Sequence, residues 1–195
     1  IDMIGFGTEA DTNQMSQLQQ LADLLSDEPD NYRMYLQDEL RQGFSFPLAR
    51  KHALLQTLRE DSPDYDWERV GFWVNEGPAV IHHDGRIYLT YSASETGAAY
   101  CMGMLAADED SDLLDPKSWT KERYPVLRTD ESRGIYGPGH NSFTEDEEGN
   151  PVMVYHARTE AEIEGNPLYN PNRHAMLMKI RWDEKTGAPI FSYED

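Results

Sequence analysis

The chain has 195 residues, 27% of them charged and 38% hydrophobic, so it is long enough to bury a core and too apolar for wholesale disorder. Its 36 acidic and 17 basic side chains give a formal net charge of −19, which argues against nucleic-acid partners and against anionic membrane surfaces. Cys101 is the single cysteine, so no internal disulfide is expected. No apolar run approaches the length of a membrane span, and the first residues lack the pattern of a signal peptide. The compartment stays open between cytoplasmic and secreted.

The first segment, residues 1–65, has a helical pattern. Leu18, Leu21 and Leu25 recur at helical spacing, and two further short helices are expected, the second beginning at Pro47. Helices this short need a surface to pack on. We interpret the segment as a small helical hairpin or cap, with an oligomerisation element as the alternative.

From about Asp66 the pattern changes to strands separated by turns. Asp84 and Gly85 stand between two β-rich runs, 79–81 and 87–92, and an Asp-Gly pair in that position is a strong hairpin signal. Further strands and hairpins are expected at 100–106, 142–155 and 175–193, the last with 175–182 as one strand before a turn at 183–187. Hairpins repeated without intervening helices predict a mainly β fold, and periodicity alone leaves sandwich, barrel and propeller open.

Several strings of residues, in order along the chain, resemble glycoside hydrolase family 43 of the arabinofuranosidase and β-xylosidase type. They are Val74–Ala79, Asp112–Trp119, Tyr136–Ser142, Tyr155–Arg158 and Pro171–Ala175. The resemblance implies a five-bladed β-propeller, of which residues 66–195 would make about two or three blades. Residues 1–65 do not resemble the family, so we expect a partial propeller preceded by a short α-helical segment.

The resemblance implies that Glu76 is the catalytic general acid of an inverting glycosidase. Such an enzyme needs one protonated carboxyl group to donate a proton to the leaving oxygen and a second carboxylate to activate water. The acid must keep its proton near neutral pH, which requires a setting that raises its pKa. Phe72, Trp73 and Val74 precede Glu76 and are expected to supply an apolar setting of this kind. The alternative is an ordinary loop carboxylate.

Four other residues are candidates for binding. The resemblance places His140 on the propeller axis, as a metal ligand and substrate contact at a calcium site held mainly by water, since calcium prefers oxygen ligands. A buried histidine bonded to backbone groups is the alternative. Arg173 would reach sugar hydroxyls or hold Glu76, unless it is a surface arginine. Trp73 and Phe72 would form a sugar-stacking wall, or else belong to the core.

The family supplies its general base, and an aspartate that tunes the acid, from blades preceding the acid, and no matching segment precedes Glu76 here. An incomplete propeller leaves strand edges and an apolar flank exposed, so we expect a homo-oligomer that closes the incomplete propeller, with the helices as an alternative cover. The expected activity is removal of α-L-arabinofuranosyl or β-D-xylosyl residues from plant hemicellulose or arabinan oligosaccharides. The alternatives are an impaired fragment that binds sugar and an interaction module.

Overall fold

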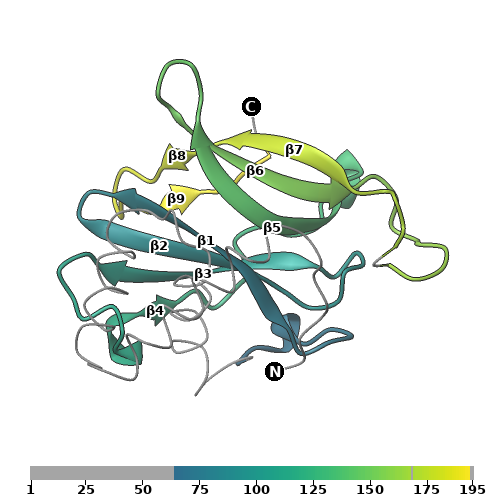
Figure 1. Ribbon diagram of the computed structural model, residues 1–195, viewed down its shortest axis with the longest axis horizontal. Helices are drawn as coiled ribbons and strands as arrows, with labels where there is room; N and C mark the ends of the chain where they lie inside the picture. The colour runs from purple at the N-terminus through teal and green to yellow at the C-terminus, as the bar shows by residue number, and fades with distance from the viewer. Residues whose placement is uncertain (1–63, 168, 194–195) are drawn as a thin grey trace, which may run out of the picture.

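The computed structural model describes residues 64–167 and 169–193, and they form a mainly β structure, as predicted (Figure 1). The helices expected in residues 1–65 lie outside the described residues. The described part of the chain has three 3₁₀ turns, at Asp66–Glu68 (η1), Pro116–Ser118 (η2) and Glu131–Arg133 (η3). Within the described ranges, no helix has the length and apolar character needed to cross a membrane.

The first sheet is a four-stranded antiparallel meander in the order β1-β2-β3-β4. Its strands are β1 (Asn75–His83), β2 (Arg86–Ala93), β3 (Cys101–Asp108) and β4 (Thr120–Lys121). The short β4 was not predicted, since two residues give no periodic signal. The β1–β2 turn confirms the predicted hairpin: Asp84 has φ 48° and Gly85 φ 72°, the left-handed pair that an Asp-Gly hairpin turn requires.

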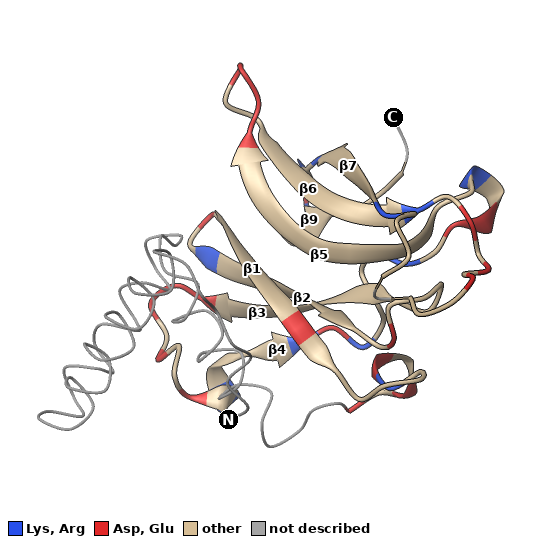
Figure 2. Cartoon of the chain, turned by 45° about the vertical axis from the view of Figure 1, so that its right-hand side comes forward, with Lys and Arg blue, Asp and Glu red and all other residues tan. Residues whose placement is uncertain are grey.

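The second sheet has the order β5-β6-β7, from β5 (Tyr136–Glu145), β6 (Pro151–Arg158) and β7 (His174–Lys179), and a small pair joins β8 (Arg181–Trp182) to β9 (Pro189–Ile190). The prediction of one strand over 175–182 is wrong in detail. Ile180 donates its N–H to Pro151 O at the end of the β6–β7 ladder, and the chain then leaves β6 to pair with β9. Figure 2 shows that many of the acidic residues lie in connecting loops, such as the β5–β6 turn.

The two larger sheets pack against one another across an apolar core (Figure 1). Alternation along the strands divides the side chains of β2 between two clusters: Tyr88 faces the second sheet, whereas Ile87 and Leu89 face the opposite side. The inter-sheet cluster includes Met102, Met104, Met153, Tyr155 and Met178, and the opposite cluster includes Tyr91, Leu105, Leu113 and Trp119. The sheets lie face to face, as blades do; the number of blades stays a prediction.

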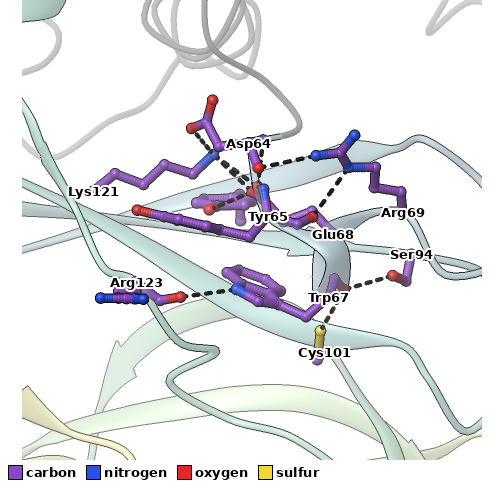
Figure 3. Close-up of polar contacts among 10 residues, drawn as sticks. Asp64, Tyr65, Trp67, Glu68, Arg69, Ser94, Cys101, Lys121 and Arg123 are labelled. Carbon is purple, nitrogen blue, oxygen red and sulfur yellow. Dashed lines mark hydrogen bonds and ion pairs between the residues drawn. The ribbon is translucent and has the colours of Figure 1, made fainter.

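A buried carboxylate fixes the start of the described chain to the first sheet. Glu68 is fully buried; it accepts a hydrogen bond from the Tyr91 hydroxyl at 2.8 Å, and the Lys121 ammonium pairs with it at 2.8 Å (Figure 3). The Trp67 carbonyl next to it accepts a bond from Ser94 Oγ at 2.7 Å. Because a buried charge is tolerated only when paired and hydrogen-bonded, these contacts fix η1, and with it the lead into β1.

Candidate active site

Glu76 is the second residue of β1, at a break in the register of the β1–β2 ladder between Glu76 and Ala79. Gly77 follows with φ 57°, a left-handed conformation that L side chains rarely adopt. A Cβ on Gly77 would lie 3.0 Å from His140 Nδ1, so glycine here lets β5 approach β1. The Glu76 side chain is 39% exposed at this junction of the two sheets.

Tyr100 and His140 hold the Glu76 carboxyl group from two sides. The Tyr100 hydroxyl donates a short hydrogen bond to Glu76 Oε1, and His140 Nδ1 lies 3.4 Å from the same oxygen. The Tyr100 hydroxyl and His140 Nδ1 are 3.5 Å apart. Ser92 Oγ accepts the His140 N–H at 2.7 Å, which fixes this residue at φ 49°. Tyr100 was not singled out from the sequence.

The electrostatic setting of Glu76 is the reverse of the one predicted. The hydrogen bond from His140 lowers the pKa of the Glu76 carboxyl, with help from Tyr100 and from the positive charge that His140 and His156 carry when protonated, and together these outweigh the raising effect of burial. The expected apolar wall does not form around the carboxyl, because Phe72 and Trp73 are 62% and 72% exposed. The described residues therefore favour ionised Glu76.

His156 and Arg173 extend the polar surroundings. The His156 ring stacks on Tyr100, with centroids 5.4 Å apart, and lies 6.4 Å from the His140 ring. Burial, with the positive charge of Arg173, lowers the pKa of His156 to about 4, so the ring is neutral at pH 7. Arg173 Nη2 donates to Pro167 O at 3.4 Å, and its buried Nε has no partner among the described residues. Arg173 thus lies near the tyrosine and histidine, with no recorded bond to Glu76.

Arg158 organises the loops around the site, a role that the sequence did not reveal. The residue is 1% exposed, and its guanidinium donates to the carbonyls of Thr96, Pro167 and Asn172 and to Asn170 Oδ1 at 2.7–3.2 Å. The loop that contains Thr96 leads into Tyr100, and the loop that contains Pro167, Asn170 and Asn172 leads into Arg173. A string such as Tyr155–Arg158 gives no sign of these partners, which are carbonyl groups of distant loops.

Other predicted residues are placed differently. Trp73 lies on the surface, where the Arg69 guanidinium sits 5.3 Å from its ring centroid. It and Phe72 are therefore not core residues, and stacking on sugar stays a prediction. The His140 side chain is 56% exposed. The described residues contain no group of three or more His, Cys, Asp or Glu side chains placed to hold a metal. A calcium ion held mainly by water near His140 stays a prediction.

The model of glycosyl hydrolases family 43 matches residues 44–187, well over half of the chain. The chain belongs to glycosyl hydrolases family 43. An extracellular exo-α-(1→5)-L-arabinofuranosidase of Streptomyces avermitilis is 53% identical over 130 residues, and an α-L-arabinofuranosidase 43 of Humicola insolens is 48% identical over the same length. The crystal structure of an α-L-arabinofuranosidase from Lactobacillus brevis is 52% identical, with a TM-score of 0.65 over 67% of this chain.

This family 43 chain spans only part of its relatives. The matched region is 66% of this chain but only 27% of the length of each of the two arabinofuranosidases from S. avermitilis and H. insolens. The structural match covers 40% of the L. brevis chain. A second model, HIGH Nucleotidyl Transferase, matches residues 1–71 and overlaps the first between residues 44 and 71. A tRNA(Met) cytidine acetate ligase of Syntrophomonas wolfei is 49% identical over 55 residues, which are 28% of this chain and 13% of the ligase. The similarity of the chain is thus divided between two kinds of protein.

Proposed function

We propose that this chain carries the proton-donating part of a glycosidase that removes α-L-arabinofuranosyl residues from arabinose-containing oligosaccharides or polysaccharides, with Glu76 as the general acid. One observation carries the proposal: the Glu76 carboxyl lies at the junction of the two sheets, held at one oxygen by Tyr100 and approached by His140. The relatives named as arabinofuranosidases support the choice of sugar. β-D-Xylosides are the second substrate class.

The proposed reaction is an inverting hydrolysis. Glu76 gives its proton to the glycosidic oxygen while water, activated by a second carboxylate, attacks the anomeric carbon from the opposite face. The main influences on the Glu76 pKa in the described part of the chain are two histidines and a tyrosine, which favour the ionised form. The proposal therefore requires negative charge from outside the described residues, which would raise the pKa of the acid and supply the base.

Substrate contacts are proposed for Arg173, Trp73, Phe72 and His140. The Arg173 guanidinium lies close enough to Tyr100 and His156 to act on both electrostatically, and its N–H groups are donors of the kind that sugar hydroxyls accept. The exposure of Trp73 and Phe72 leaves their rings accessible for stacking on a sugar.

Calcium remains part of the proposal only as an ion held mainly by water, with the exposed His140 side chain as the contribution of this chain. Calorimetric titration with calcium of the chain and of His140→Ala tests this role, and equal heats from both would refute it.

A sugar-binding fragment with little turnover is the second candidate, favoured by the lowering of the Glu76 pKa by His140 and Tyr100. Such a fragment would bind arabinose oligosaccharides and leave them intact. A pure interaction module would do neither.

The test compares the chain with Glu76→Gln on two substrates that differ in their leaving group. An alcohol leaves poorly without a proton, whereas 4-nitrophenolate leaves readily. We expect Glu76→Gln to lose far more activity on α-1,5-arabinobiose than on 4-nitrophenyl α-L-arabinofuranoside, with binding of arabinose oligosaccharides retained. Equal losses on both substrates would refute the acid role. Binding without hydrolysis by the unsubstituted chain would support the second candidate, and the absence of both would leave the interaction module.

A further inference from the structure

We propose that Tyr100 is a positioning residue for Glu76: its hydroxyl anchors Oε1, so that the catalytic proton resides on Oε2 and is delivered from there. The inference deepens the proposed function and rests on it. The contacts that Tyr100 and His140 make with the carboxyl group both go to Oε1. Oε2 has no recorded partner among the described residues, which leaves it for the glycosidic oxygen.

The position of Tyr100 is closely determined by packing. The residue is 1% exposed, its N–H donates to Gly97 O at 3.2 Å, and its ring stacks on His156 at an interplanar angle of 12°. A buried aromatic ring enclosed in this way has one available rotamer, so its hydroxyl occupies a fixed point in the site.

Two glycines of β5 make room for this ring. A Cβ on Gly139 would lie 2.5 Å from Tyr100 Cε1, and one on Gly137 would lie 2.2 Å from Gly97 O, so both would clash. Gly137 also has φ 55°, and the ladder with β6 is irregular on both sides of Gly139. The string Tyr136–His140 therefore does more than carry His140: its glycines let the β5 backbone close over Tyr100.

The chemistry of the phenol suits an anchor. Burial and the neighbouring Glu76 raise the pKa of Tyr100 well above its usual value, so the hydroxyl keeps its proton and remains a donor at every working pH. An oxygen that accepts this bond is the poorer place for the carboxyl proton, which favours Oε2. When the proton passes from Oε2 to the glycosidic oxygen, the C–O bond breaks with its electron pair going to that oxygen. The carboxyl then becomes a carboxylate, to which the Tyr100 bond is stronger.

The first test is an NMR titration of the Glu76 side-chain carboxyl carbon, assigned by its loss in Glu76→Gln, in the full chain and in Tyr100→Phe. Tyr100→Phe removes a bond that favours the carboxylate, so the midpoint of the Glu76 titration should rise by about one pH unit. Tyr91→Phe is the matched control, because it also removes a buried hydroxyl bonded to a glutamate, Glu68. It should leave the Glu76 midpoint unchanged. An unchanged midpoint in Tyr100→Phe overturns the proposal.

A second measurement needs no variant that might fail to fold. In the unsubstituted chain, the Tyr100 Cζ resonance should titrate with the same midpoint as Glu76, because ionisation of the acceptor changes the bond from the phenol. A Tyr100 resonance that stays constant through the Glu76 titration overturns the proposal.

Kinetics separate a positioning role from a structural one. Tyr100→Phe should lower kcat for α-1,5-arabinobiose by about tenfold with KM nearly unchanged. In the pH profile of kcat, the apparent pKa assigned to the acid should rise by the same amount as the NMR midpoint. A shifted midpoint with unchanged kcat and pH profile would make the bond merely structural and overturn the proposal. If instead Glu76→Gln fails the leaving-group test, the proposed function fails while the NMR result still reports the bond.

Discussion

Replacing Arg158 by Met should destabilise the chain strongly, because the guanidinium is buried and holds two loops through neutral acceptors. Among the described residues its hydrogen-bond partners are carbonyl oxygens and one side-chain amide, and none is a carboxylate. Met preserves much of the apolar stem but leaves the carbonyls of Thr96, Pro167 and Asn172 without their donor. At about 1 kcal/mol for each unsatisfied carbonyl, the free energy of unfolding should fall by about 3 kcal/mol.

Arg158→Lys provides an intermediate case. A lysine ammonium has three donors on a single atom, so it cannot reproduce the five bonds that the planar guanidinium makes. The loss should be about half of that caused by Met. Urea unfolding at pH 7, followed by tryptophan fluorescence, measures both variants.

Arg86→Met is the matched control for loss of an arginine. The Arg86 side chain is 40% exposed and lies 3.8 Å from Asp108 Oδ1, the geometry of a weak surface ion pair. Its replacement should change the free energy of unfolding by less than about 1 kcal/mol. If Arg158→Met is no less stable than Arg86→Met, the bonds to the loop carbonyls do not stabilise the fold as argued.

Three further outcomes are expected. The pKa of His156 is lowered to about 4 in the folded chain against 6.5 for a free histidine, so the unfolded state takes up its proton first. The contribution of His156 to the free energy of unfolding should have its full value above pH 6.5 and should fall as the pH drops toward 4. Urea midpoints across that range should therefore vary less in His156→Phe. Gly139→Ala should lower the free energy of unfolding, measured with urea, by about 2 kcal/mol, because the new Cβ would clash with Tyr100. Gly97→Ala is its control: a Cβ there would meet only ordinary contacts, so the loss should be less than about 1 kcal/mol. Leu177 is 73% exposed on β7; if the chain associates through this face, Leu177→Lys should shift sedimentation toward monomer, and an unchanged distribution would refute that mode of association.

Much of the fold was predictable because its signals are local. The Asp84-Gly85 turn and the alternation along β2 depend on neighbouring residues and on the two-residue period of a strand. The division at Ile180 was not predictable, because residues 175–182 are uniformly suited to a strand and only pairing with Pro151 and β9 ends β7.

The candidate site was partly predictable, in its residue types but not in its contacts. The strings containing Glu76 and His140 were recognisable, and the structure brings the two side chains within 3.4 Å although 64 positions separate them. The described residues shift the pKa of Glu76 in the direction opposite to the prediction, because the prediction was inferred from neighbours in the sequence. Those neighbours are exposed, and the groups that act on the carboxyl come from β5, from β6 and from Tyr100, which directly precedes β3.

The β character, the hairpin turns, the family and the candidate acid follow from short strings of residues, so they were accessible from the sequence. The sharing of one Glu76 oxygen by Tyr100 and His140, and the binding of loop carbonyls by Arg158, became visible only in the folded chain. Both a pKa and a hydrogen bond depend on which groups lie within a few ångströms. That proximity arises only when separate strands and loops pack together.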